Sequence, residues 1–145
     1  MELKLLHIFD DVMNLYGEYA NVAVMARYLT DLGHTVTVET LSLYEKKDIS
    51  GYDLYYMGAG TERRQKLALS QLLTYREALL HACDEGKVML FTGNAFELLG
   101  ASVTDSEGKT SSESCWWALR IRFTIWSCAQ FRRVSSSSHS CVLST

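Results

Sequence analysis

The hydrophobic positions of the chain first follow a strand-like pattern. Residues 3–9 form an apolar run that predicts a strand buried on both faces. Residues 34–41 alternate between apolar and polar side chains, which predicts a strand nearer the edge of a sheet. Residues 52–57 and 88–91 are short apolar runs and predict two further strands.

Two segments between these runs have helical periodicity. Residues 18–32 predict a helix that Gly33 ends. Residues 62–84 predict one long amphipathic helix, with Thr61 as its N-cap. The apolar positions expected to face the core of this helix are Leu67, Leu69, Leu72, Leu73, Tyr75, Leu79, Leu80 and Cys83.

Strands that alternate with helices predict an α/β fold, in which a parallel sheet carries helices on both faces. Ligands of such sheets bind at the carboxyl ends of the strands, near a switch in strand order. The loops at residues 10–17, 58–65 and 92–95 each follow a predicted strand. We therefore expect these loops to converge on one site.

Residues 87–100 read as a buried strand, a tight turn and the start of a helix. In α/β proteins a turn of this kind can present a nucleophile beside backbone N–H groups that stabilise an oxyanion. Here Gly93 and Asn94 stand at the tip. A second tight turn is expected at residues 58–60, where a larger side chain would crowd the backbone.

Composition limits the classes of function. The 145 residues are 48% hydrophobic and 21% charged, which is typical of one globular domain. A net charge of −3 does not indicate a nucleic-acid or membrane-surface partner. No apolar run approaches the roughly 20 residues of a membrane span, and the N-terminus lacks the features of a signal peptide. We therefore expect a cytoplasmic protein.

The four cysteines do not form close pairs. We expect reduced thiols, because disulfides are rare in the cytoplasm. A zinc site formed by Cys115, Cys128 and Cys141 with His139 is the alternative, although zinc ligands usually come in close pairs. We expect neither a metal nor a cofactor.

The character of the chain changes near residue 110. Residues 111–145 contain all three Trp and a run of four Ser, but no Lys, Gly or Asp. We interpret residues 1–110 as the α/β domain and residues 111–145 as an atypical Ser-, Trp- and Cys-rich tail. The abrupt shift suggests a tail read in a shifted frame, for which we expect poor order.

Motifs within the first 110 residues resemble a known family. They are residues 11–18 with Asn21, residues 52–60 with Gln65, and residues 96–100. Together they resemble the glutamine amidotransferase domain of the cobyric acid synthase type. Within that group they look most like the amidotransferase subunits of lipid II isoglutaminyl synthases.

The resemblance implies a flavodoxin-like three-layer sandwich with a mostly parallel sheet, here incomplete at the C-terminus. It also implies glutamine hydrolysis by an elbow cysteine that a distant histidine activates, with ammonia passing to a partner. The family pattern places Cys, Gly and Gln on Gly93, Ala95 and Glu97 of this chain. With no cysteine at this position, we expect no catalytic residue, although backbone N–H groups near Gly60 and Asn94 would still face each other as an oxyanion hole.

The resemblance implies a set of ligand-binding residues for glutamine or a small amide. They are Asn14, Tyr16, Gly17, Gly58, Ala59, Gly60, Gln65, Asn94 and Glu97. The implied partner is a ligase or synthase subunit of the peptidoglycan-precursor type, in cell-wall or cobalamin-type synthesis. Two alternatives stay open: an active amidotransferase or hydrolase with an unrecognised nucleophile, and a non-functional truncated fragment.

Overall fold

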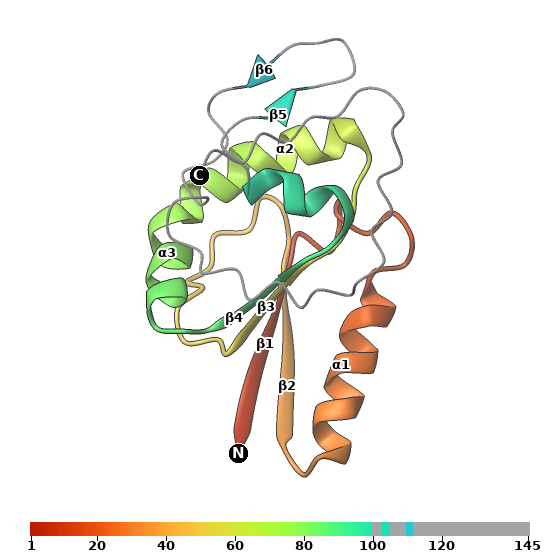
Figure 1. Ribbon diagram of the computed structural model, residues 1–145, viewed down its shortest axis with the longest axis vertical. Helices are drawn as coiled ribbons and strands as arrows, with labels where there is room; N and C mark the ends of the chain where they lie inside the picture. The colour runs from red at the N-terminus through yellow and green to blue at the C-terminus, as the bar shows by residue number, and fades with distance from the viewer. Residues whose placement is uncertain (100–102, 105–109, 112–145) are drawn as a thin grey trace, which may run out of the picture.

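The computed structural model describes residues 1–99, 103–104 and 110–111. Its centre is a four-stranded sheet in the order β2-β1-β3-β4 (Figure 1). The predictions for residues 112–145, including the frame shift, the poor order and the zinc site, lie outside the described residues. The boundary near residue 110 therefore stays a prediction.

All neighbouring strands of this sheet are parallel. The strands are β1 (Glu2–Ile8), β2 (Thr35–Leu41), β3 (Leu54–Met57) and β4 (Val88–Phe91). The prediction of an edge strand is confirmed for β2, whereas β3 begins at Leu54 and not at residue 52. A separate antiparallel pair joins β5 (Val103–Thr104) to β6 (Thr110–Ser111).

Helices cover both faces of the sheet, so that the predicted three-layer α/β arrangement is confirmed (Figure 1). Helix α1 (Tyr19–Asp31) packs through Val22 on Leu5 and Tyr56. Helices α2 (Glu62–Leu72) and α3 (Arg76–Asp84) pack on the opposite face, where the larger core lies. The strand order matches the first four strands of a flavodoxin-like sheet, with the switch point between β1 and β3.

The single helix predicted for residues 62–84 is wrong. A 3-10 turn at Leu73–Tyr75 divides it into α2 and α3. The Tyr75 hydroxyl donates to the Glu45 carbonyl at 2.7 Å and accepts the Lys47 backbone N–H at 3.4 Å. The turn thus places Tyr75 against a distant loop. Leu67, expected in the core, is 41% exposed.

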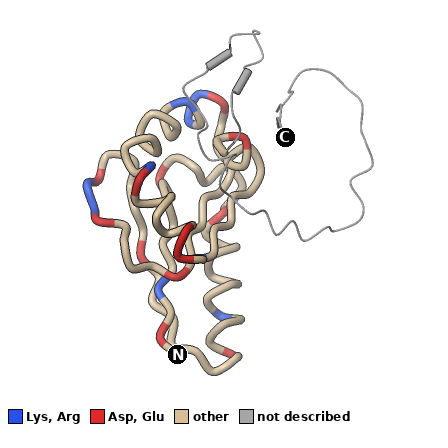
Figure 2. Tube along the Cα trace, turned by 60° about the vertical axis from the view of Figure 1, so that its left-hand side comes forward, with Lys and Arg blue, Asp and Glu red and all other residues tan. Residues whose placement is uncertain are grey.

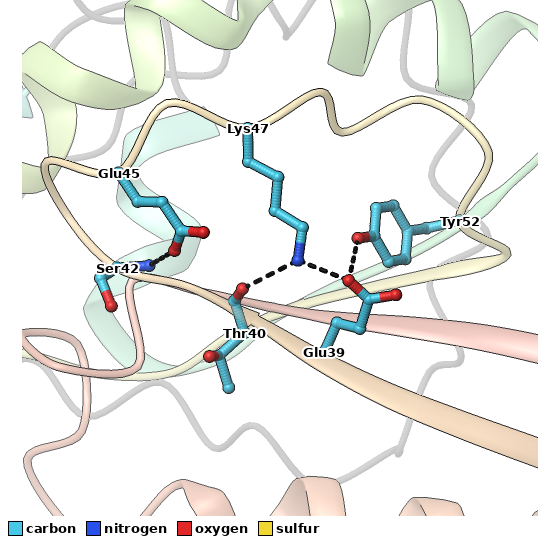
Figure 3. Close-up of polar contacts among 6 residues, drawn as sticks. All are labelled: Glu39, Thr40, Ser42, Glu45, Lys47 and Tyr52. Atoms are coloured by element: carbon cyan, nitrogen blue, oxygen red, sulfur yellow. Dashed lines mark hydrogen bonds and ion pairs between the residues drawn. The ribbon is translucent and has the colours of Figure 1, made fainter.

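The loop between β2 and β3 is fixed to the edge strand by polar contacts (Figure 3). Lys47 Nζ lies 2.5 Å from Glu39 Oε2 and 3.3 Å from the Thr40 carbonyl oxygen. The Tyr52 hydroxyl donates to the same Glu39 oxygen at 2.8 Å. The hydrogen bonds from Lys47 and Tyr52 lower the pKa of Glu39. These contacts anchor the loop at the edge of the sheet.

Charged residues are scattered along the described part of the chain (Figure 2). In the loop after β2, Lys46 and Lys47 stand between Glu45 and Asp48 in the sequence. Among the described residues, none of the helices has the length and apolar character that crossing a bilayer requires.

Candidate functional site

Hydrogen bonds join the loops that were predicted to converge. The Leu15 N–H donates to the Ala59 carbonyl at 2.9 Å, which links the loop after β1 to the turn after β3. The Thr92 N–H donates to the Met57 carbonyl at 3.0 Å, which links the end of β4 to β3. Because all these loops follow parallel strands, they meet at the carboxyl edge of the sheet, beside its switch point.

The turn at residues 58–60 is crowded, as predicted. A Cβ atom on Gly58 would lie 2.4 Å from Glu18 Cγ, and one on Gly60 would lie 2.5 Å from Met13 Sδ. No real Cβ atom tolerates such distances without displacement of its neighbours. The two glycines therefore allow α1 and the loop after β1 to approach the backbone of this turn.

The elbow after β4 begins with a left-handed residue. Gly93 has φ +58°, and the segment Gly93–Leu99 (η2), where the start of a helix was predicted, is a 3-10 helix. A Cβ atom on Gly93 would lie 2.8 Å from the Cβ of Ala59. The backbone conformation and the neighbouring Ala59 thus both favour glycine at position 93.

Asn94 bridges the elbow and the turn. Its Oδ1 accepts the Gly60 N–H at 2.9 Å, and its Nδ2 donates to the Gly60 carbonyl at 2.7 Å. The expectation that N–H groups near Gly60 and Asn94 face each other as a free oxyanion hole is therefore wrong for Gly60. Its N–H is already paired with the carboxamide of Asn94.

Gln65 holds the elbow from the side of α2. This side chain is buried, and its Nε2 donates to the Asn94 carbonyl at 2.7 Å and to Glu97 Oε2 at 2.8 Å. The Gln65 backbone N–H continues α2 by donating to the Thr61 carbonyl at 2.8 Å. Gly60, Gln65, Asn94 and Glu97 thus form one connected group.

A buried carboxylate lies beneath the turn. Glu18 is 7% exposed, and its Oε2 accepts hydrogen bonds from the Tyr56 hydroxyl at 2.5 Å and from Asn21 Nδ2 at 2.7 Å. Burial alone would raise the pKa of Glu18, but hydrogen bonds from Tyr56, the Ala59 N–H and two further side chains outweigh it and lower the pKa. Glu18 therefore binds the turn as an anion.

Thr92 is the only hydroxyl-bearing residue of the elbow, at residues 92–95, and it faces this carboxylate. Its Oγ1 lies 3.1 Å from the Tyr56 hydroxyl and 3.5 Å from Glu18 Oε2. A general base works best with a pKa near the working pH, and the pKa of Glu18 is shifted in the opposite direction. The hydroxyl of Thr92 thus has no suitable base in this group.

Three other predicted site residues, Asn14, Tyr16 and Gly17, make none of the hydrogen bonds of this group. Asn14 Oδ1 accepts the Tyr19 N–H at 3.4 Å, and the Gly17 carbonyl accepts the Ala20 N–H at 2.9 Å. Both residues thus serve the start of α1, and no hydrogen bond of the described residues joins them to Gly60. Tyr16 is 82% exposed. The described residues contain no cluster of His, Cys, Asp or Glu arranged to hold a metal ion.

Sequence reasoning missed Glu18 and Tyr56 as members of the site. The sequence placed Tyr56 within a predicted strand and Glu18 at the first position of a predicted helix. Two signals were available: both residues lie within motifs that carry the resemblance, and Glu18 directly follows the loop predicted to reach the site. His7, in β1, is 2% exposed, and burial lowers its pKa despite Asp10 and Glu18.

Comparison with known proteins gives two distant relatives, and no protein-family model matches the chain. The chain is 28% identical over 108 residues to lipid II isoglutaminyl synthase (glutamine-hydrolyzing) subunit GatD of Streptococcus pneumoniae, covering 74% of this chain and 42% of the relative. It is 24% identical over 107 residues to the subunit of the same name from Staphylococcus aureus, covering 74% and 44%. The chain thus spans less than half the length of these curated relatives.

Proposed function

We propose that the chain is a glutamine amidotransferase-like subunit of the cobyric acid synthase type without glutaminase activity of its own. It acts by binding a partner ligase or synthase, in the amidation of cell-wall precursors or in cobalamin-type synthesis. The similarity to two glutamine-hydrolysing synthase subunits supports this family and favours the cell-wall role. Residues 1–110 carry this function, with residues 111–145 as a separate tail.

The observation that carries the proposal is the glycine at the tip of the elbow. Gly93 occupies the position that the family pattern gives to the nucleophile, and a side chain there would be strained by the left-handed backbone and would have to displace Ala59. A hydroxyl nucleophile is commonly activated by an adjacent general base. The carboxamide of Asn94 is not a nucleophile. The Thr92 hydroxyl faces the Glu18 carboxylate, whose lowered pKa makes it a poor general base.

The turn at residues 58–60 and the elbow support a role as a subunit. Gly60, Gln65, Asn94 and Glu97 join the turn at residues 58–60 to the elbow in one hydrogen-bonded group, which supports a ligand-handling site at this position. The relatives are named as subunits of a synthase. A chain that retains this scaffold without a nucleophile can still bind such a partner.

A glutaminase assay with the purified full chain tests the proposal. We expect no release of ammonia from L-glutamine above the buffer blank. Ammonia release that Thr92→Val or Asn94→Ala abolishes would instead establish the alternative of an active amidotransferase or hydrolase. Thr92→Val keeps the shape of the side chain and removes only the hydroxyl, so that it separates loss of chemistry from loss of packing.

One observation favours the alternative of a fragment without a function. Strand β4 ends the described sheet, and its Val88 and Leu90 are 58% and 40% exposed. An apolar edge strand of this kind promotes aggregation. Sedimentation and thermal unfolding of the full chain distinguish the two readings. A monodisperse protein with a cooperative transition supports a working subunit, and irreversible aggregation supports the fragment.

A further inference from the structure

Helix α1 lies on the outside of the sheet and exposes apolar side chains on its outward face (Figure 1). Tyr19, Val24 and Tyr28 are 64%, 68% and 64% exposed, and all three stand outside the core of the described residues. Residues three and four positions apart are neighbours on a helix surface, so these side chains lie close together with Ala20 and Ala23. Contiguous exposed apolar surface of this kind marks an interaction site.

The charges of α1 do not oppose a contact with this face. Arg27 and Asp31 are the only charged residues of α1, and Arg27 Nε lies 2.9 Å from Asp31 Oδ1 (Figure 2). The helix thus carries no net charge, and its basic group has an acidic partner one turn away. A surface rich in tyrosine, with arginine and little net charge, is typical of protein interfaces.

The outward residues of α1 are arranged symmetrically about a point between positions 23 and 24. Residues at equal distances on either side of this point form the pairs Tyr19 with Tyr28, Ala20 with Arg27, and Ala23 with Val24. With about 3.6 residues per turn, the point faces away from Val22 and Met25, which pack on the sheet. Two copies of α1 that pack antiparallel about a two-fold axis at this point therefore place each residue against its pair on the other copy.

This antiparallel arrangement satisfies both sterics and charge. Ala23 and Val24, at its centre, are small, so that the two helices can approach each other closely. Arg27 of one copy lies about 10 Å from Arg27 of the other along the helix axis, at a rise of about 1.5 Å per residue, and the two Asp31 side chains lie farther apart. The tyrosine rings meet at both ends of the contact, where aromatic pairs add to the association.

We propose that the outward face of α1 is an interface between two copies of this chain, packed antiparallel about the point between Ala23 and Val24. A second copy is favoured over a different protein because the face is complementary to itself in side-chain order and in charge. The inference goes beyond the proposed function, since it concerns the outward side of α1 and uses neither the elbow nor a glutamine ligand. A glutaminase result of either sign leaves it untouched.

Sedimentation equilibrium of the full chain, at micromolar to submillimolar concentrations, tests whether two copies associate. We expect a reversible monomer–dimer equilibrium in the native chain. Tyr28→Lys should weaken it at least about tenfold, because it places an unpaired charge in the interface. Tyr44→Lys is the matched control, since Tyr44 is 73% exposed in the loop after β2, and it should leave the equilibrium unchanged.

The proposal is overturned by a native chain that stays monomeric, whether another protein covers the face or nothing does. Association only into large irreversible aggregates, or an equal effect of Tyr28→Lys and Tyr44→Lys, overturns it as well. Both side chains are exposed, so thermal unfolding should show that both variants fold like the native chain.

A mixture of two variants tests the antiparallel register. In a mixed dimer of Tyr28→Lys and Tyr19→Glu chains, the new lysine of one copy faces the new glutamate of the other, and the second tyrosine pair stays native. The equimolar mixture should therefore associate at least about tenfold more tightly than either variant alone. A mixture that associates no better than the separate variants overturns the pairing.

Cross-linking identifies what covers the face. Benzoylphenylalanine in place of Tyr28 is photoactivated in an equal mixture of ¹⁴N- and ¹⁵N-labelled full chains. We expect cross-links of mixed isotope composition to the peptide that contains Tyr19. Cross-links confined to one isotope, to residues 112–145 for example, would show that the chain covers its own helix and would overturn the proposal.

Discussion

Gly93 lies so close to Ala59 that a Cβ atom on the glycine would stand 2.8 Å from the alanine Cβ. The two residues belong to different loops, one after β4 and the other after β3. Their contact couples the tip of the elbow to the turn beside it. Any side chain introduced at position 93 must therefore displace Ala59 as well as adopt a left-handed backbone conformation.

This contact predicts that Gly93→Ala destabilises the fold by about 2 to 4 kcal/mol, from left-handed strain together with overpacking. Ala59→Gly in the same chain should recover part of that loss, because it removes the clashing methyl group. Gly86→Ala is the control: Gly86 also has positive φ, at +76°, but a Cβ atom there would meet nothing within 4 Å. Its cost should be the strain alone, about 1 to 2 kcal/mol.

Urea unfolding of the single and double variants measures this coupling. A double variant with Ala59→Gly that is no more stable than Gly93→Ala alone would show that Ala59 does not limit position 93. The same pair of positions decides whether a cysteine can be introduced at position 93 as a nucleophile. Gly93→Cys should be accommodated in the folded chain better when Ala59→Gly accompanies it.

Glu18 gives the fold a dependence on pH. Its pKa is lowered in the folded chain, so its carboxylate stabilises the fold above the ordinary glutamate pKa of about 4.3, and that contribution is lost as the pH falls through the lower folded value. Glu18→Gln should cost about 2 kcal/mol at neutral pH, because it removes a charged acceptor from several hydrogen bonds. The difference from the native chain should shrink in acid.

Unfolding free energies measured from pH 7 down to pH 3 check this behaviour. Glu2→Gln, at an exposed glutamate of β1, is the control and should change stability little at any pH. A Glu18→Gln deficit that stays constant into acid would mean that the carboxylate is not held as an anion in the folded chain.

Two tyrosine hydroxyls donate to the loop between β2 and β3 in different surroundings. Tyr55 donates to the Ile49 carbonyl at 2.8 Å in the core, and Tyr75 donates to the Glu45 carbonyl at 2.7 Å near the surface. Tyr55→Phe leaves a buried carbonyl unpaired and should cost about 1 to 3 kcal/mol, whereas Tyr75→Phe should cost under about 1 kcal/mol because water replaces the hydroxyl. Equal losses in thermal unfolding would contradict this difference in burial.

The sequence predicted the sheet better than it predicted the site. Local periodicity was sufficient for β4, whose bounds agree with the prediction, and for the edge position of β2. The break at Leu73–Tyr75 was not predicted, and its Tyr75 contacts a loop about thirty residues earlier in the chain. Hydrophobic periodicity along the sequence does not indicate such tertiary contacts.

In the site too, the features that depend on strand order were predicted, and those that depend on tertiary contacts of side chains were not. The convergence of the loops follows from the parallel sheet, and it brought Gly60 and Asn94 together. The pairing of the Asn94 carboxamide with the Gly60 backbone depends on one side-chain orientation that no sequence pattern specifies. The burial of Glu18 was missed, because an acidic residue at a helix start is usually solvated and its partners Tyr56 and Thr92 come from two other segments.

Labelling with a diazo ketone analogue of glutamine tests the absence of a nucleophile most directly, since the reagent alkylates a residue that attacks at the carboxamide position of glutamine. The purified full chain is incubated with the reagent, with and without excess L-glutamine, and mapped by peptide mass spectrometry. We predict no glutamine-protected adduct on residues 92–97. A glutamine-protected adduct on Thr92 or any other residue of the elbow would contradict the proposal that this amidotransferase-like site is catalytically silent.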